Sequence, residues 1–297
     1  MGSQRDGSGE NRIQNRGSLQ ILTLSMVIFG TIGICRRFIG LPSDVIAFGR
    51  GIMGGVFLLL VLRVRRERFA WDRIAKKDFL MLVISGIMIG FNWILLFEAY
   101  NYTTVAVATL CYYMQPVIVI ALSPVILREK LPAKQFLCVV ISVIGMVLVS
   151  GVTGGTAGEG SRGVILGLGA AVLYASVVLM NKYIHVDAAF EKTIIQLFSA
   201  AAVMVPYMAL TGTFHSYDLS VLELILFLVV GVVHTGIAYT MYFGSIEALP
   251  ARTCALLSYV DPVTAVVLSA LFLHEPMSVS GFVGAVLIIG SAAYSQI

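Results

Sequence analysis

Long apolar runs alternate along the chain with short charged or glycine-rich segments. A run of about 20 predominantly apolar residues is long enough to cross the hydrocarbon core of a bilayer as a helix. The runs predict ten such helices in two groups of five, at residues 19–39, 44–62, 79–98, 104–127 and 135–150 and at residues 163–181, 193–210, 220–243, 253–273 and 279–295. The expected fold class is therefore an all-α polytopic membrane protein with ten transmembrane helices.

The segments before and between the runs predict the domain organisation. Residues 1–18 are polar and glycine-rich, which predicts a disordered cytoplasmic N-terminus ahead of an uncleaved first span. Residues 19–150 form the first five-helix unit, and residues 163–297 form the second. The glycine-rich residues 151–162 between them are expected to be an external linker.

The composition excludes the common soluble classes. Hydrophobic residues make up 58% of the 297 residues and charged residues only 12%, whereas a soluble domain carries about 25% charged residues. So few charged residues cannot cover the surface of a soluble enzyme. The chain is also too apolar for a disordered scaffold. The four cysteines lie inside apolar runs without the spacing of a metal site, so we expect buried thiols, no disulfides, no metal and no cofactor.

Lysine and arginine are distributed unevenly between the two sides of the predicted membrane. If the N-terminus is inside, only Arg36, Arg37 and Arg162 lie outside and Arg50 lies within a span, which leaves 16 of the 20 basic residues inside. Basic residues concentrate in cytoplasmic loops, so both termini are predicted to be cytoplasmic, at the plasma membrane. The densest basic run, residues 63–77, lies between two apolar runs and indicates a topology anchor or a docking site for anionic lipid headgroups, and no nucleic acid partner.

The second half of the chain repeats the first. A shift of 146 residues aligns residues 90–132 with residues 236–278 without a gap, and ten positions are identical, including Tyr113/Tyr259 and Pro116/Pro262. Each half has an odd number of predicted spans, so the second copy must enter the membrane from the opposite side. Inverted repeats place a substrate site at their interface near the bilayer midplane and support alternating access. The pattern favours a transporter over a channel, an enzyme or a receptor.

Two repeated motifs carry a resemblance to a known family. The sequence YMQP at residues 113–116 is followed by REKL at residues 128–131 and a helix with Gly145, and the second half has YVDP at residues 259–262, LHEP at residues 273–276 and then Gly281 and Gly284. From residue 19 onward the chain resembles the EamA-type branch of the drug/metabolite transporter superfamily. The resemblance implies two inverted five-helix halves, a central cavity lined by the first, third, fourth, sixth, eighth and ninth helices, and commonly the export of amino acids or related metabolites. Pro276 stands where the first half has Lys130, a departure that is expected to bend this loop differently.

Proline and polar residues share equivalent mid-span positions in the fourth and ninth predicted helices. Pro116 and Pro262 each remove a backbone N–H, which predicts a kink that either directs a freed carbonyl into a cavity or only shapes the helix. Gln115 and Asp261 precede them. An acid at the midplane should face the interior, as a proton carrier, as a ligand for a substrate ammonium group or as a structural acid. His234 lies at a similar depth, so a pair with Asp261 is a further expectation.

Aromatic and amide side chains complete the candidate substrate site. Aromatic faces suit apolar or cationic ligands and tyrosine hydroxyls suit polar ones, although aromatic residues in membranes also serve packing. Trp93 and Tyr239 occupy equivalent positions of the third and eighth predicted helices. The candidate substrate-binding residues are Asn92, Trp93, Tyr112, Tyr113, Gln115, His234, Tyr239, Tyr259 and Asp261.

A second group of charged residues is expected toward the outer face. Its members lie at or near the outer ends of the first three spans and are Arg36, Arg37, Asp44, Arg50 and Glu98. They predict either a salt-bridge network at the interface, or an outer gate that opens during transport, with Arg50 able to contact a carboxylate. Glu129 and Glu275 begin equivalent loops, and each is expected to cap the helix that follows it.

The sequence therefore predicts a secondary active transporter of a small metabolite that works by alternating access. An exporter of amino acids or related metabolites is the leading interpretation, with proton coupling through Asp261 as a hypothesis. The alternatives are a non-transporting membrane receptor or assembly protein, and a transporter of sugars, nucleotides or cationic drugs. No arrangement of serine, cysteine or metal-ligating residues points to an enzyme. The expected partners are a small-molecule substrate, the lipid bilayer and protons, and the protein is expected to be a monomer or a homodimer.

Overall fold

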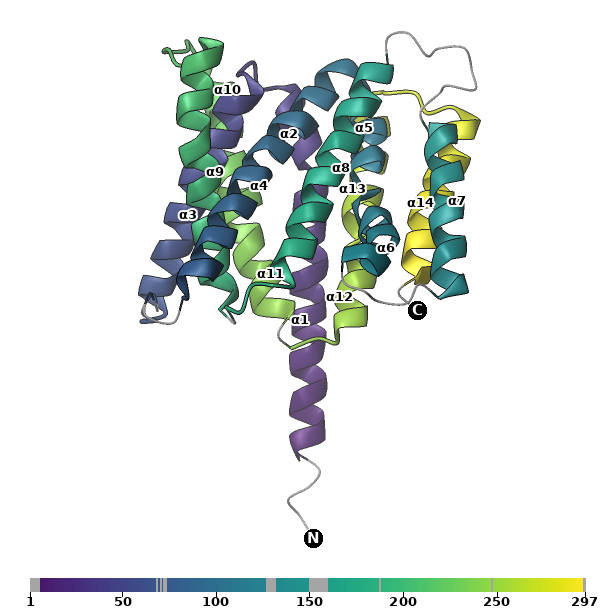
Figure 1. Ribbon diagram of the computed structural model, residues 1–297, viewed down its shortest axis with the longest axis horizontal. Coiled ribbons are helices and arrows are strands. Elements are labelled where there is room, and N and C mark those ends of the chain that lie inside the picture. The colour runs from purple at the N-terminus through teal and green to yellow at the C-terminus, as the bar shows by residue number, and fades with distance from the viewer. Residues whose placement is uncertain are drawn as a thin grey trace.

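The computed structural model describes residues 6–67, 69, 71, 74–126, 132–149, 160–186, 188–246 and 248–295. Throughout these ranges the regular structure is helical, which confirms the all-α prediction (Figure 1). The elements are α1 (Asp6–Gly30), α2 (Ile32–Arg37), α3 (Ser43–Val64), α4 (Lys76–Tyr102), α5 (Val105–Tyr112), α6 (Gln115–Ile126), α7 (Ala133–Val149), α8 (Ser161–Asn181), α9 (Ala189–Thr211), α10 (Val221–Leu228), the π-helix η3 (Val229–Ile237), α11 (Ala238–Ile246), α12 (Ala251–Leu257), α13 (Val260–Phe272) and α14 (Val279–Ser295).

These helices have the length and the surface of membrane spans. Seven described segments are long and apolar enough to cross a bilayer, and three shorter apolar helices, α7, α13 and α14, accompany them. Large apolar side chains face outward, among them Leu60, Ile165 and Leu222, which are 57%, 68% and 59% exposed. So large an apolar surface is unfavourable in water and is the expected exterior in lipid. The chain is a multi-pass integral membrane protein.

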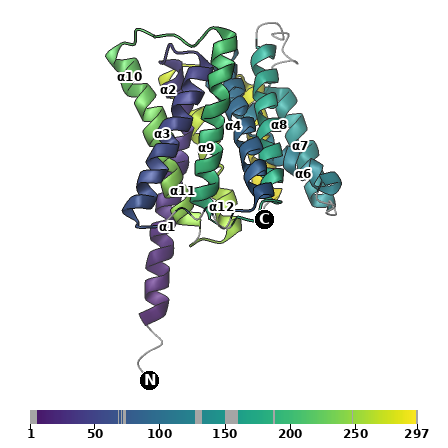
Figure 2. The ribbon, with the colours of Figure 1, turned by 60° about the vertical axis from the view of Figure 1, so that its left-hand side comes forward.

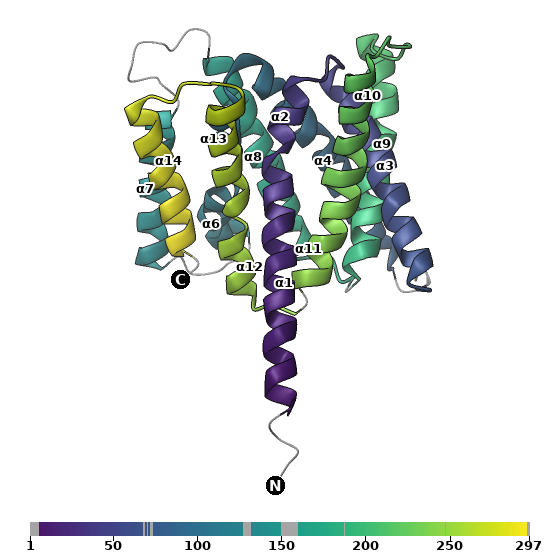
Figure 3. The same ribbon diagram turned by 180° about the vertical axis from the view of Figure 1, so that it is seen from behind.

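The helices stand side by side in one bundle. The pair α7 and α14 forms one edge of it, while α3, α9 and α10 lie at the opposite edge (Figure 1, Figure 3). The start of α1 and the end of α14 lie at the same end of the bundle, and α1 projects beyond the other helices there (Figure 2). The first span was predicted to begin at residue 19, but α1 begins at Asp6. Much of the segment predicted to be a disordered tail is therefore helical in the structure.

Glycines allow the closest helix contacts. A Cβ atom on Gly145 of α7 would lie 2.7 Å from the carbonyl oxygen of Gly284 in α14. A Cβ atom on Gly51 of α3 or Gly86 of α4 would lie 2.7 Å or 2.5 Å from a backbone oxygen of α9. Small residues at such crossings let backbones approach and pack without lipid between them. These crossings tie α9 of the second half to α3 and α4 of the first.

Two of the predicted spans are interrupted just before a proline. The fourth predicted span consists of α5 and α6, which are separated by a turn at Tyr113 and Met114, and the ninth consists of α12 and α13, which are separated at Ser258 and Tyr259. Proline cannot donate a backbone hydrogen bond and clashes with the preceding turn, so it is tolerated best near the start of a helix. The breaks expose irregular backbone at the level where Gln115 and Asp261 stand, which membrane proteins allow only beside protein or a polar cavity.

Candidate functional site

Arg50 of α3 points into the bundle. Its guanidinium carbon lies 4.2 Å from the ring centroid of Trp93 and 5.5 Å from that of Phe97, both on α4. Its Nε donates to Thr235 Oγ1 at 3.0 Å, and only 5% of the residue is exposed. No described residue contributes a hydrogen bond or ion pair to its two terminal nitrogens. Although the sequence grouped Arg50 with the outer charges, the structure places it with the aromatic candidates.

The π-helix η3 presents His234 and Thr235 to the same region. In the wider turn of a π-helix, a side chain can reach the carbonyl oxygen five residues earlier. Thr235 Oγ1 donates to the carbonyl oxygen of Val230 at 3.0 Å. His234 Nδ1 lies 3.2 Å from the carbonyl oxygen of Val229, and its Nε2 lies 2.8 Å from Thr31 Oγ1. Both ring nitrogens are thereby engaged, and neither contacts Asp261, so the expected pair is not formed. Short π-helical segments occur frequently at functional sites.

Asp261 receives a hydrogen bond from across the two breaks. The hydroxyl of Tyr113, in the turn between α5 and α6, donates to Asp261 Oδ2 in the first turn of α13. Gln115, the equivalent of Asp261 in the first half, has its Oε1 buried without a hydrogen-bond partner. The two proline motifs therefore meet in space, and they bring an acid, a phenol and an amide oxygen into the interior.

Tyrosines connect the arginine to the acid. Tyr100 and Tyr112 lie within electrostatic reach of both Arg50 and Asp261. The ring of Tyr112 lies 5.8 Å from that of Tyr113 and 5.7 Å from that of Tyr174 on α8. Arg50 and Asp261 therefore share two tyrosines, Tyr100 and Tyr112, that interact electrostatically with both of them.

The three remaining central candidates, Tyr239, Asn92 and Tyr259, have different surroundings. Tyr239 stays with the cluster, 5.5 Å from the ring of Phe29 and within electrostatic reach of Arg50. Asn92 is fully buried, with its Nδ2 donating to the carbonyl oxygen of Ala170 at 2.6 Å and its Oδ1 without a partner. Tyr259 interacts instead with Cys138 of α7 and is 8% exposed. The structure therefore places it against another helix, apart from the Arg50 side of the cluster.

Sequence reasoning missed four residues of this cluster. Tyr100 and Tyr174 are aromatic residues inside spans, the same signal that selected the other tyrosines, and could have been found by it. Thr31 and Thr235 carry no such signal, because a threonine within a span usually bonds to its own helix backbone. Only the packing of η3 against α1 and α3 shows that they hold His234 and Arg50.

Three of the outer charges, Arg36, Glu98 and Asp44, form two separate groups of contacts. Arg36 donates to the carbonyl oxygen of Ile39 at 2.9 Å and to Ser43 Oγ at 3.2 Å, and Ser43 Oγ donates to Glu98 at 2.6 Å. Asp44 accepts from the hydroxyl of Thr211, the last residue of α9, at 3.2 Å and from that of Thr213, two residues further on, at 2.5 Å. These contacts join the ends of α2, α3, α4 and α9 through hydrogen bonds more than through ion pairs.

Glu275 joins the halves on the same side. It forms an ion pair with Arg37 at 2.6 Å and accepts from the backbone N–H of Val105, the first residue of α5, at 2.8 Å. Ser269 Oγ donates to it at 2.5 Å, and Arg37 also donates to the carbonyl oxygen of Tyr100. The expected cap of the following helix, α14, is therefore corrected: Glu275 caps α5, because α5 packs beside α13. Glu129 lies outside the described residues.

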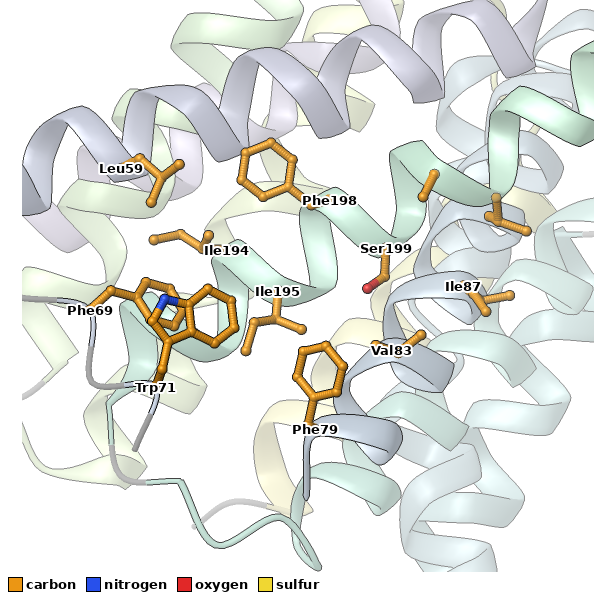
Figure 4. Close-up of a pocket in the computed structure, with 12 residues that line it drawn as sticks. Leu59, Phe69, Trp71, Phe79, Val83, Ile87, Ile194, Ile195, Phe198 and Ser199 are labelled. Atoms are coloured by element: carbon orange, nitrogen blue, oxygen red, sulfur yellow. The ribbon is translucent and has the colours of Figure 1, made fainter. Parts of the chain in front are cut away.

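Two cavities have linings that include none of the residues of the Arg50 cluster. One, of about 540 Å³, opens between α3, α4 and α9 (Figure 4). The other, of about 440 Å³, lies between α5, α13 and the segment before α14. No group of histidine, cysteine, aspartate or glutamate within the described ranges could hold a metal ion.

Comparison with known proteins places the chain in a family. A model of the EamA-like transporter family matches residues 17–151 and again residues 161–295. The uncharacterized transporter YxxF of Bacillus subtilis (strain 168) is 29% identical over 99% of this chain and 94% of its own length. Protein RarD of Salmonella typhi is 29% identical over 79% of this chain and 78% of its own, and protein PecM of Dickeya dadantii (strain 3937) is 26% identical over 86% and 84%.

The fold is also found among solved structures. One crystal structure superposes with a TM-score of 0.66 over 94% of this chain and 97% of the other, at 19% sequence identity. At this identity the likeness concerns the fold alone. With the family model matched twice along its length, the chain belongs to the EamA-like transporter family.

Proposed function

We propose that the protein is a secondary transporter that exports a small amino acid, or a related metabolite with an amino and a carboxylate group, by alternating access. The observation that carries the proposal is the guanidinium of Arg50, which is buried in the bundle and has no protein partner among the described residues for its terminal nitrogens. A charge in that position is unfavourable unless a ligand or water completes it. Membership in a transporter family supports the movement of a small molecule past this point.

The chemistry of Arg50 favours a carboxylate. A guanidinium presents parallel N–H groups that match the two oxygens of a carboxylate, and the ring of Trp93 lies 4.2 Å from the guanidinium carbon. Arg36 and Arg37 differ, because carbonyl, hydroxyl or carboxylate oxygens of the protein accept from their terminal nitrogens. Among these three arginines, Arg50 is the one whose two terminal nitrogens both lack a hydrogen-bond acceptor among the described residues.

Asp261 supplies the complementary charge. Its carboxylate accepts from Tyr113 and retains lone pairs for an ammonium group. Tyr100 and Tyr112 lie within electrostatic reach of both charges and offer ring faces and hydroxyls to the body of a substrate. An amino acid has the same order of groups, a carboxylate and an ammonium on a small carbon frame.

Proton coupling through Asp261 belongs to the same proposal. A proton on Asp261 removes the negative charge that attracts the substrate ammonium, so proton binding and substrate binding exclude one another. Such exclusion is what a carrier needs to exchange an inward proton for an outward substrate. Tyr113 then positions the carboxylate in both states, as a donor to the anion and as an acceptor from the acid.

Alternating access rests on an inverted repeat with ten spans. The shift of 146 residues relates α3 to α9 and relates α4 to the segment from α10 to α11. The packing follows this correspondence, since α4 packs against α8 and α9 while α11 and η3 pack against α1 and α3. The start of α1 and the end of α14 lie at one end of the bundle, which agrees with an even number of crossings, and the excess of basic residues favours the cytoplasm for that end.

Counterflow in proteoliposomes tests the proposal. Vesicles with purified protein are loaded with one unlabelled amino acid at a time and diluted into a trace of the same labelled compound. Exchange should exceed that of protein-free vesicles for at least one amino acid. The unlabelled amide, which lacks the carboxylate, and the deaminated acid, which lacks the ammonium, should each compete at least about tenfold more weakly, the loss expected for a hydrogen-bonded charge.

Each other result contradicts a defined part of the proposal. Exchange of sugars, nucleotides or cationic drugs, without exchange of amino acids, contradicts the proposed substrate class. Stabilisation by a ligand without any exchange favours a receptor or assembly protein. Equal competition by the amino acid and its amide shows that no carboxylate is recognised at Arg50.

A further inference from the structure

The larger cavity is a groove in the surface that faces lipid. Its walls are one residue of α3, Leu59, three of α4 and six of α9, and its mouth is formed by Phe69 and Trp71 in the segment between α3 and α4 (Figure 4). Nearly all of the lining side chains are apolar, with Ser199 as the one hydroxyl. The volume of about 540 Å³ lies within the range of about 300–1,000 Å³ found for pockets that hold small ligands.

The groove has the length of one leaflet. Along α9 its lining runs from Ile194 to Val203, and along α4 it runs from Phe79 to Ile87. At about 1.5 Å per residue these stretches measure about 14 Å and 12 Å. The hydrocarbon core of a bilayer is about 30 Å thick, so one leaflet contributes about 15 Å. The groove therefore reaches from the end of the helices to the region of the midplane, as an acyl chain does.

Small residues of α9 keep the groove open. Ser199 and Ala202 line it where larger side chains would fill it, and Phe198 borders it. The mouth is held in place: the ring of Trp71 stacks on Phe69 at 4.2 Å between centroids and lies 6.4 Å from that of Phe79. Trp71 is 59% exposed. An exposed tryptophan at the end of a span is typical of the level of lipid headgroups.

Cations flank the mouth of the groove in the chain. Arg63, Arg65 and Arg66 precede Phe69, and Lys76 and Lys77 stand between Trp71 and Phe79. All five are exposed, and no described residue forms an ion pair with any of them. Each basic residue near a membrane surface attracts anionic lipid by about 1 kcal/mol. An apolar groove of this length, with cations on both sides of its mouth residues in the chain, complements a lipid with a negative headgroup.

We propose that this groove is a binding site for one anionic phospholipid, with an acyl chain between α3, α4 and α9 and the phosphate headgroup among Arg63, Arg66 and Lys77. The site is separate from the Arg50 cluster and does not depend on the transported substrate. It gives the basic run at residues 63–77 a second role beside topology. It also places a lipid against the crossing of α9 with α3 and α4, through which the two halves touch.

Fluorescence quenching tests the site, because the chain has only two tryptophans and one of them stands at the mouth. The Trp93→Phe variant reports on Trp71 alone. It is placed in phosphatidylcholine bilayers that contain a small fraction of acyl-brominated phosphatidylglycerol or, in parallel, of equally brominated phosphatidylcholine. The anionic quencher should act at a concentration at least about fivefold lower, the factor that corresponds to 1 kcal/mol. If Trp93→Phe does not fold, the wild-type chain and Trp71→Phe give the same signal by difference.

Two further variants separate a site from general attraction to the surface. The two quenchers should become equally effective in a variant with Gln in place of Arg63, Arg66 and Lys77. Ala202→Phe fills the groove and leaves the charges in place, so it should reduce the preference for the anionic lipid while neutral quenching changes little. Equal quenching in the parent variant overturns the proposal. So does a preference that Ala202→Phe leaves unchanged, because the attraction is then one of surface charge without an acyl-chain site.

Discussion

Arg50 and Gln196 occupy equivalent positions in the two halves, because the shift of 146 residues relates α3 to α9. Both are buried, at 5% and 7% exposure. Gln196 Nε2 donates to Ser85 Oγ at 2.8 Å and to Asn181 Oδ1 at 3.1 Å. Arg50 donates through Nε to Thr235, while its terminal nitrogens have no partner among the described residues. The protein thus supplies hydrogen-bond acceptors for the amide nitrogen of Gln196, whereas the terminal nitrogens of Arg50 have none among the described residues.

Under the proposed function, this difference separates a structural residue, Gln196, from a ligand-facing one, Arg50. A polar side chain buried among helices in a membrane is stabilising when neighbouring side chains satisfy it, as they do for Gln196. A charge that lacks a counter-ion destabilises the helix that carries it, so it persists where a ligand supplies that counter-ion. The two halves thus use one position of a duplicated fold in two ways, and the following variants test that distinction in order of expected effect.

Arg50→Gln should have the largest effect. Loss of one partner of a buried, hydrogen-bonded charge pair weakens binding by about 2–5 kcal/mol, so the apparent affinity in counterflow should fall by at least about 30-fold. Thermal stability of the substrate-free protein, measured by fluorescence-detected size-exclusion chromatography after heating, should change little, because removal of a buried charge without a counter-ion offsets the lost contacts with Thr235 and Trp93. A large loss of stability with unchanged affinity would make Arg50 the structural residue.

Arg50→Lys sharpens the same test. Lysine keeps the positive charge and loses the planar fork that binds a carboxylate through two parallel hydrogen bonds. We expect affinity between those of the wild type and Arg50→Gln. Wild-type affinity in this variant would show that only the charge matters, and would weaken the case for a carboxylate ligand.

Asp261→Asn should have the next largest effect. The amide keeps the shape and cannot exchange a proton or attract an ammonium group as an anion does, so affinity should fall by at least about tenfold, as for a lost hydrogen bond to a charged group. Export driven by an imposed pH gradient should stop, while residual counterflow without a gradient becomes independent of pH. Wild-type dependence on the pH gradient in this variant would exclude Asp261 as the proton carrier.

Gln196→Leu should change stability and leave affinity alone. Hydrogen bonds between membrane helices contribute about 1 kcal/mol each, and Ser85 and Asn181 each lose a donor. The thermal midpoint should therefore fall by a few degrees while the counterflow affinity stays within about twofold. A loss of affinity comparable to that of Arg50→Gln would place Gln196 in the substrate path and end the contrast between the two positions.

The sequence predicted the helices well because lipid imposes a simple rule on span length and composition. All ten predicted runs coincide with described helices or with consecutive helices, and the last one, Val279–Ser295, has the same bounds. Pattern alone also located both breaks, because proline acts through its own backbone. These features depend on residues close together in the chain.

Features that depend on neighbours in space were beyond the sequence. Arg50 was grouped with the outer charges by its depth, but the direction in which a side chain leaves α3 is set by packing on α4 and η3. His234 and Asp261 have similar depth and still face different partners. Glu275 caps α5 because α5 and α13 lie side by side, which no spacing along the chain reveals. The depth of a residue in the membrane follows from its position along its own span, whereas the direction of its side chain depends on the helices that pack around it.

Trp93→Phe should cause the smallest change in free energy, and the size of that change decides what Trp93 contributes. A cation over an aromatic face is stabilised by about 0.5–1 kcal/mol at exposed sites and by more where water is excluded, with tryptophan the strongest partner. Phenylalanine keeps a ring under the guanidinium, and Phe97 remains 5.5 Å away, so only part of this energy is lost. We therefore expect a two- to threefold loss of affinity in counterflow, with turnover at saturating substrate unchanged. A loss as large as that of Arg50→Gln would mean that the tryptophan contacts the substrate itself, whereas unchanged affinity for both Trp93→Phe and Trp93→Leu would mean that Thr235 alone orients Arg50.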